Sequence, residues 1–225
     1  MFRTELNIPP STLKINHQDA VLLIGSCFTN NIGDQLNQNK FNALVNPFGT
    51  IFNPLSINTL LCSSLGDRAK IESGYGRNGD VHFHYDFHSQ FSSTDKNEIE
   101  TKIAESLNKT ADFIKSTKWL IITWGTAFVY EQLENKTIVS NCHKMPSSKF
   151  NKRLLSQEEI VKDFEKLISQ LPADIQIIIT ISPVRHTKDT IELNSVSKSI
   201  LRLSSHLLKE KYSNVYYFPS FEIMM

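Results

Sequence analysis

Apolar residues cluster along the chain in four short runs, and apolar positions recur at helical spacing in segments between them. Each run is largely continuous rather than alternating, which is typical of strands that are buried on both faces of a parallel sheet. The runs are residues 20–24 (AVLLI), 119–125 (WLIITWG), 175–182 (IQIIITIS) and 215–218 (VYYF). Strands that alternate with helices indicate an α/β layer fold with a mainly parallel sheet, here interrupted by two insertions.

The segments between the runs carry helix start signals. Residues 95–116 repeat apolar positions at helical spacing. Ser156, followed by Glu159, has the pattern of a capping box and predicts the start of another helix. Thr29 or Asn30 is expected to cap the helix that follows the first apolar run. Further helices are expected to begin near Pro54 and to cover residues 192–212.

The ends of three predicted strands are rich in small and polar residues. They read GSCFTNN at 25–31, TWGTAFVY at 123–130 and SPVRHTKD at 182–189. In parallel α/β sheets, ligands bind outside the carboxyl ends of the strands. We therefore expect these three loops to converge on one edge of the sheet and to form a pocket there.

The length of the chain and its charge limit the number of domains and the kinds of partner that we expect. The chain has 225 residues, which favours a single domain over residues 1–225. Its 24 basic and 23 acidic side chains give a net charge of +1 with no basic block, so we expect no nucleic-acid partner. No apolar run approaches the roughly 18–20 residues that cross a bilayer, so we expect a cytoplasmic protein without membrane contact. Cys27, Cys62 and Cys142 are widely spaced and are expected to be free thiols.

Six motifs spread over the chain carry a resemblance to a known family. They are GSCFTNNIG, NPFGTIFNP, TWGTAFVYE, NCHKMP, SPVRHTKD and YFPSFEI. Together they resemble GSCFA-type proteins, whose wider relatives are the SGNH (GDSL-like) esterases and acylhydrolases. The resemblance implies a three-layer, flavodoxin-like α/β fold of the SGNH-hydrolase type, and activity on ester bonds.

The motif after the first strand contains two potential nucleophiles. The resemblance places Cys27 where the wider superfamily has its nucleophilic serine, and Ser26 where it has Asp. A thiol at a helix N-terminus lies in a positive field that favours the thiolate, which is a stronger nucleophile than a hydroxyl. Alternatively, Cys27 is a small packing residue and Ser26 caps its own turn. The sequence leaves open whether Ser26 or Cys27 is the nucleophile.

Backbone N–H groups of Cys27 and Gly49 are the expected donors to an oxyanion, because a glycine lets its N–H approach a substrate oxygen closely. The resemblance aligns Gly125 with the glycine of a Gly-x-Asn motif, but Ala127 stands in the place of the asparagine. The hydroxyl of Thr126, or a neighbouring N–H, would have to replace that donor. Gly49 and Gly125 are equally well explained as ordinary turn glycines.

The general base is the largest departure from the superfamily pattern. The superfamily carries its catalytic Asp and His in a D-x-x-H motif after the last strand, and this sequence reaches FPSFEIMM without one. We therefore expect that a C-terminal segment with this motif is missing relative to the family. His186 is the alternative base or a substrate ligand, with Arg185 beside it as an anion anchor. Both residues also suit a solvated polar loop.

Two other stretches contain histidine. In DVHFHYDFHSQF, strict alternation predicts a strand with one polar face, formed by His82, His84, Asp86 and His88. This set suits a zinc site, a reserve dyad of Asp86 and His88, or simply a solvated strand face. Cys142 and the adjacent His143 would form a metal clip only if their side chains converged. We expect no metal and no other cofactor.

These observations lead to two main functional hypotheses. The first is an ester hydrolase or acyltransferase that acts on small acyl or carbohydrate esters, with Cys27 attacking the carbonyl carbon. The second is a non-catalytic module of the same fold that binds a glycan or an anion through Arg185, Asn46 and His143. The expected partner is thus a small-molecule or carbohydrate ester, and the sequence leaves the oligomeric state open.

Overall fold

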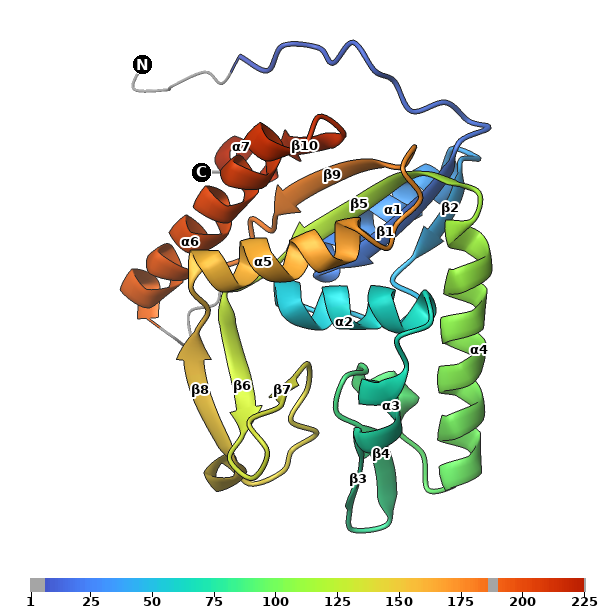
Figure 1. The fold of residues 1–225 in the computed structure, drawn as a ribbon, viewed down its shortest axis with the longest axis vertical. Coiled ribbons are helices and arrows are strands. Elements are labelled where there is room, and N and C mark those ends of the chain that lie inside the picture. The colour runs from blue at the N-terminus through green and yellow to red at the C-terminus, as the bar shows by residue number, and fades with distance from the viewer. Residues whose placement is uncertain (1–6, 186–189, 225) are drawn as a thin grey trace.

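A five-stranded parallel sheet forms the centre of the protein (Figure 1). The computed structural model describes residues 7–185 and 190–224. The strand order is β10-β9-β5-β1-β2, and every neighbouring pair is parallel. The strands are β1 (Ala20–Gly25), β2 (Asn42–Val45), β5 (Thr117–Trp124), β9 (Gln176–Ile181) and β10 (Val215–Phe218). The prediction of an α/β fold with a mainly parallel sheet is confirmed.

Strand β2 is the one strand of this sheet that the apolar runs do not predict. It has only four residues, NALV, and it lies at an edge of the sheet beside β1. Its burial is incomplete, because Asn42 is exposed and Ala43 and Val45 are half-buried. A short edge strand needs no continuous apolar run, so its sequence carries only a weak strand signal.

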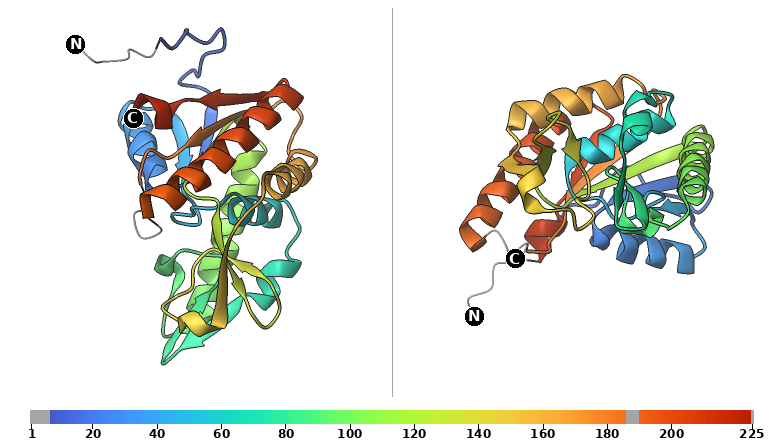
Figure 2. Two further views of the ribbon diagram at one scale, coloured as in Figure 1. Left: turned by 90° about the vertical axis from the view of Figure 1, so that its left-hand side faces the viewer. Right: turned by 90° about the horizontal axis from the view of Figure 1, so that it is seen from below.

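Helices lie on both faces of the sheet (Figure 2). The α-helices are α1 (Cys27–Gln38), α2 (Pro54–Ser64), α3 (Ala69–Ser73), α4 (Lys96–Ile114), α5 (Gln157–Ile168), α6 (Thr190–Lys211) and α7 (Ser220–Ile223). The predicted capping box at Ser156 is present and starts α5, and Pro54 is the first residue of α2. Helix α1 begins earlier than predicted, because Ser26, in extended conformation, is its N-cap in place of Thr29 or Asn30.

Side chains alternate between two hydrophobic clusters along the central strands. Leu22 and Ile24 of β1 point into the larger cluster, with buried side chains of α2, α4, α5 and α6. Val21 and Leu23 point the other way, into a smaller cluster that includes Leu36 of α1. All four side chains are fully buried, and each such burial contributes about 1.5–3 kcal/mol to folding. The sheet therefore forms a rigid platform for the loops at its carboxyl end.

Two antiparallel insertions lie together on one side of α2 (Figures 1 and 2), and we call them the insertion lobe. The first contains β3 (Tyr75–Asn78), β4 (Val81–His84) and the 3-10 turn η1 (Ser89–Phe91). The second contains β6 (Phe128–Gln132), β7 (Ile138–Val139), the 3-10 turn η2 (Ser147–Lys149) and β8 (Phe150–Leu154). Backbone hydrogen bonds from Ser140 and Asn141 to the carbonyl of Tyr85 join the two insertions.

The prediction that residues 81–88 form one strand with a polar face is wrong. Strand β4 ends at His84 instead of continuing to His88. Val81, which would lie on the opposite, apolar face, is 41% exposed, whereas His84, on the predicted polar face, is fully buried. The alternation breaks because the chain turns after β4, where the N–H of Phe87 donates to the carbonyl of His84.

Candidate functional site

The chain order of the strands reverses between β1 and β5, which are neighbours in the sheet. Strand β2 lies on one side of β1, and the later strands β5, β9 and β10 follow on the other side. In open parallel sheets, this switch point is where ligands bind, outside the carboxyl ends of the strands. The motif at residues 25–28 lies directly at the carboxyl end of β1, as the sequence predicts.

Gly25, the last residue of β1, makes a tight exit from the sheet possible. Its φ is +141°, and a Cβ at this position would lie 2.2 Å from the carbonyl oxygen of Thr123 on β5. The N–H of Ser26 donates to the same oxygen at 3.2 Å, and the carbonyl of Gly25 accepts from the N–H of Ile51 at 3.0 Å. Only glycine fits here, and it fixes the direction in which α1 starts.

Asn46 supports this exit from behind. Its side-chain oxygen accepts the N–H of Gly25 at 2.8 Å, and its side-chain nitrogen donates to Oδ1 of Asn30 at 2.6 Å. Asn46 is buried and has a φ of +41°, a conformation that Asn tolerates better than most residues. Both ends of the amide thus have protein partners, so Asn46 braces this turn, and its role as a substrate ligand stays a prediction.

The structure distinguishes the two candidate nucleophiles by exposure. Ser26 is 1% exposed, and its hydroxyl has no hydrogen-bond partner among the described residues. Cys27 is exposed, has a free thiol and is the first residue of α1. The first N–H groups of a helix have no acceptor within the helix, so those of Cys27 and Phe28 are available beside the thiol. The positive end of the helix dipole lies at the same place.

The other expected oxyanion donors are engaged within the protein. The N–H of Gly49 donates to the carbonyl of Asn46 at 2.8 Å. The N–H groups of Gly125 and Thr126 both donate to the carbonyl of Phe52, at 2.7 and 3.1 Å. Gly49 has a φ of +77°, and a Cβ there would lie 2.3 Å from Cβ of His88, which explains this glycine by packing.

The hydroxyl of Thr126 is engaged as well. It accepts the N–H of Phe128 at 3.0 Å and lies 3.1 Å from the hydroxyl of Ser197 on α6. Of the expected donors, the N–H of Cys27 at the start of α1 is the one that has no acceptor among the described residues, and the N–H of Phe28 beside it has none either. The sequence could not show this, because the acceptor Phe52 lies far along the chain from Gly125 and Thr126.

The loop after β9 carries the expected anion anchor and base. Arg185 is exposed at the carboxyl end of β9, where a ligand could reach it. His186 lies outside the described residues, so its role as base stays a prediction. His206 is exposed on α6.

His143 belongs to the insertion lobe. Its ring stacks on Phe83 at 4.3 Å between centroids, and its Nε2 lies 2.9 Å from the carbonyl oxygen of His84 and 3.2 Å from that of Phe87. Carbonyls only accept, so Nε2 carries a proton and donates to them. Burial lowers the pKa of His143, and burial raises the pKa of the neighbouring Cys142 thiol to about 11. His143 therefore joins the two insertions and has its donor already occupied.

His84 has a similar structural role. Its Nε2 lies 2.8 Å from the carbonyl oxygen of Ile71, and its Nδ1 accepts the N–H of Asp86 at 3.1 Å. This pair of bonds requires the neutral ring, and burial lowers the pKa of His84 to about 4. His88 accepts the N–H of Gln90 at 3.3 Å and packs against Gly49. Among the described residues, no group of three or more His, Cys, Asp and Glu side chains is arranged to hold a metal ion.

The sequence analysis missed a buried lysine at the ends of β5 and β9. Lys198 on α6 is 2% exposed, and its Nζ donates to the carbonyls of Gly125 and Ser182, both at 2.7 Å. The available signal was its place on the buried stripe of α6, at helical spacing from Asn194, Leu201 and Ser205. A lysine on such a stripe is unusual enough to mark a site.

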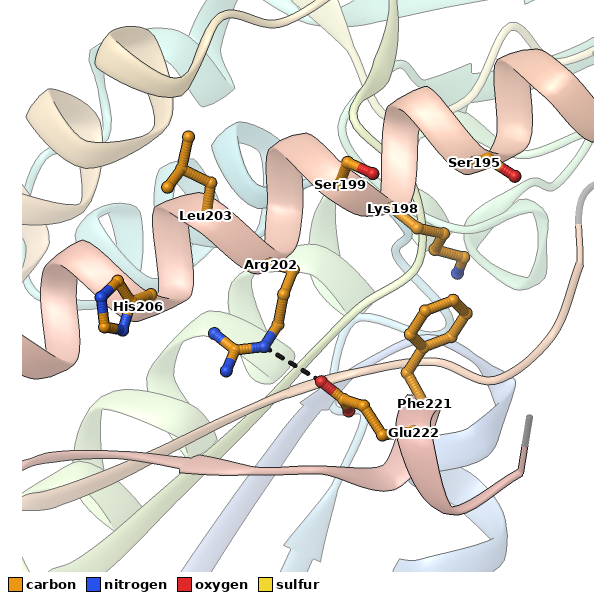
Figure 3. A pocket seen from close by; sticks show the side chains of 8 residues that line it. All are labelled: Ser195, Lys198, Ser199, Arg202, Leu203, His206, Phe221 and Glu222. Atoms are coloured by element: carbon orange, nitrogen blue, oxygen red, sulfur yellow. Dashed lines mark hydrogen bonds and ion pairs between the residues drawn. The ribbon is translucent and has the colours of Figure 1, made fainter. Parts of the chain in front are cut away.

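Lys198 borders a pocket of about 590 Å³ between α6 and α7 (Figure 3). The ring of Phe221 lies below its ammonium, with 5.9 Å from Nζ to the ring centroid. Arg202 and Glu222 form an ion pair at 3.0 Å along the same pocket. The remaining lining residues are Ser195, Ser199, Leu203 and His206.

Comparisons with known proteins agree with the motif analysis. Within the described residues, no helix is both long and apolar enough to cross a membrane. A search of curated proteins and a search of solved structures gave no match. A sequence model described as the GSCFA family matches residues 20–225. Since this match covers nearly the whole chain, the protein belongs to the GSCFA family.

Proposed function

We propose that this protein is an SGNH-like ester hydrolase or acyltransferase in which Cys27 is the nucleophile. The observation that carries the proposal is the exposed thiol of Cys27 at the start of α1, directly after the buried turn at Gly25 and Ser26. The strand order supports a flavodoxin-like arrangement of the SGNH type, with the thiol at the switch point. The expected substrates are small acyl or carbohydrate esters.

In the proposed reaction, the thiolate of Cys27 attacks the carbonyl carbon of the ester. The carbonyl oxygen becomes an oxyanion, which accepts hydrogen bonds from the N–H groups of Cys27 and Phe28. When the intermediate collapses, the bond between the carbonyl carbon and the alcohol oxygen breaks, and the acyl group stays on Cys27 as a thioester. The alkoxide takes a proton from water or from a general acid and leaves as the alcohol. Water or a second alcohol then attacks the thioester, releases the acid or the new ester, and restores the thiol.

The second step needs a base that removes a proton from water or from the acceptor alcohol. His186 is the predicted base in this chain, and Arg185 is the predicted anion anchor beside it. Without an efficient base, the first step would outrun the second and the thioester would accumulate. The proposal therefore predicts a rapid first turnover, followed by a slow steady rate.

Stopped-flow measurement of p-nitrophenol release from p-nitrophenyl acetate tests this proposal. We expect a burst of one equivalent per chain that disappears in Cys27→Ala. Cys142→Ala is the matched control and should retain the burst, because Cys142 is half-buried in the insertion lobe. A burst that survives in Cys27→Ala would exclude Cys27 as the nucleophile.

One observation favours the second candidate function, a non-catalytic module that binds a glycan or an anion. The N–H groups of Gly49, Gly125 and Thr126 are all engaged within the protein, which leaves fewer donors for an oxyanion than we expected. Such a module would bind a ligand saturably without releasing p-nitrophenol. Equilibrium binding of glycans and acetate, measured beside the burst, separates the two functions.

A further inference from the structure

Lys198 is a buried cation without a carboxylate partner in the described part of the chain. Its two acceptors are neutral carbonyl oxygens, and none of the ion pairs between described residues includes it. Glu222, the acidic residue that lines its pocket, is paired with Arg202. Burial lowers the pKa of Lys198 to about 8, so the side chain still carries its charge at neutral pH.

This charge lies at the same edge of the sheet as Cys27. Gly125 directly follows β5 and Ser182 directly follows β9, so Lys198 bridges the carboxyl ends of two adjacent strands. Cys27 stands at the carboxyl end of β1, which is the next strand after β5. Neighbouring strands are about 4.8 Å apart, so the carboxyl ends of β1 and β9 are on the order of 10 Å apart across this edge of the sheet.

Lys198 and its neighbour Ser197 also hold the turn after β5. The hydroxyl of Ser197 accepts the N–H of Ala127 at 2.8 Å, and Lys198 binds the carbonyl of Gly125. From the other side, the carbonyl of Phe52 accepts two N–H groups of the same turn. The turn is thus held on both sides, by Ser197 and Lys198 of α6 on one side and by Phe52 on the other.

We propose that Lys198 is a positioning residue of the candidate site, and that its charge, which no carboxylate among the described residues neutralises, favours anionic species at Cys27. A role for Lys198 in catalysis rests on the proposed function, because the thiolate and the oxyanion are the anions that its charge would stabilise. Its electrostatic effect does not depend on that function. A unit charge at a distance on the order of 10 Å changes the reactivity of the site toward an anion by about three- to tenfold at low salt.

Alkylation of Cys27 by two reagents tests the inference. Iodoacetate is an anion and iodoacetamide is neutral, and both transfer their carbon to a thiolate with loss of iodide. Peptide mapping gives the rate constant at each cysteine. We expect the iodoacetate-to-iodoacetamide ratio at Cys27 to fall about three- to tenfold in Lys198→Met and to stay unchanged in Lys198→Arg. The ratio at Cys142 should not change in either variant.

A purely structural role for Lys198 would change both rates together and leave their ratio unchanged in Lys198→Met, which would overturn the inference. If Lys198→Met does not fold, Lys198→Gln replaces it, because a glutamine can still donate to a carbonyl but carries no charge. A ratio at Cys27 that falls in Lys198→Gln supports the inference. An unchanged ratio in Lys198→Gln overturns it. Because alkylation needs no ester, loss of the p-nitrophenol burst would not affect either outcome.

Discussion

Two regions of this protein, the end of β1 and the insertion lobe, contain potentially reactive side chains. The first leaves its reactive side chain exposed, whereas the second uses such side chains as structural contacts. At the end of β1, glycine, asparagine and backbone groups form the frame, and the thiol of Cys27 remains exposed above it. In the insertion lobe, the rings of His84 and His143 are themselves the frame, with Nε2 of each ring engaged by carbonyls. Cys27 therefore presents its reactive atom to solvent, whereas the two histidines use their ring nitrogens to hold the chain.

The largest expected effect comes from the frame at β1. In Gly25→Ala, the new Cβ would lie 2.2 Å from a backbone oxygen, so the strands must separate. We expect a loss of at least about 4 kcal/mol in the free energy of unfolding, measured by urea titration of tryptophan fluorescence. Gly66→Ala is the matched control, because Gly66 also has a positive φ, +121°, but a Cβ there would have no neighbouring atom within 4 Å. It should lose only about 1–2 kcal/mol, and equal losses would contradict this description of Gly25.

Acid should destabilise the insertion lobe next. His84 has its pKa lowered to about 4 in the folded state, so the unfolded state binds the proton more readily. Its contribution to stability is therefore complete above pH 6.5 and is lost as the pH falls toward 4, with a total of about 3 kcal/mol. The unfolding free energy of His84→Gln should depend less on pH over this range. A profile identical to that of the wild type would show that His84 is not the titrating group.

Replacing Asn46, which braces the turn at Gly25, should cause a smaller loss in the free energy of unfolding. Asn46→Ala leaves the N–H of Gly25 and Oδ1 of Asn30 without their partner, and we expect a loss of about 2 kcal/mol. Exposed Asn39 is the matched control, with a single side-chain bond to the carbonyl of Gln35, and Asn39→Ala should lose less than about 0.5 kcal/mol. If Asn46→Ala were as stable as Asn39→Ala, the description of Asn46 as a brace would be wrong.

The sequence predicts the layers of the fold well and the polar contacts poorly. The runs at 20–24 and 175–182 identify buried strands, because burial on both faces favours apolar residues at most positions. The capping box at Ser156 identifies a helix start, since its two hydrogen bonds are local. Such features depend on near neighbours in the chain, which is why they can be recognised in advance.

The candidate site depends on contacts between distant segments. Phe52 accepts from Gly125 and Thr126, and Lys198 donates to the carbonyl of Gly125, so these partners are separated by about 70 residues in each case. No local pattern specifies such pairs. The alternation at 81–88 misleads for a related reason, because His84 is buried by a contact with Ile71 that the strand pattern does not contain.

Locating the acyl group after reaction with an activated ester tests the role of Cys27 most directly. The protein is exposed briefly to p-nitrophenyl acetate, quenched in acid and mapped by peptide mass spectrometry, beside Cys27→Ala and Ser26→Ala. We predict a single acetyl group on Cys27 that is absent from Cys27→Ala and present in Ser26→Ala. An acetyl group on Ser26, no acetyl group at all, or acetylation spread over the lysines and all three cysteines would contradict the assignment of Cys27 as the nucleophile.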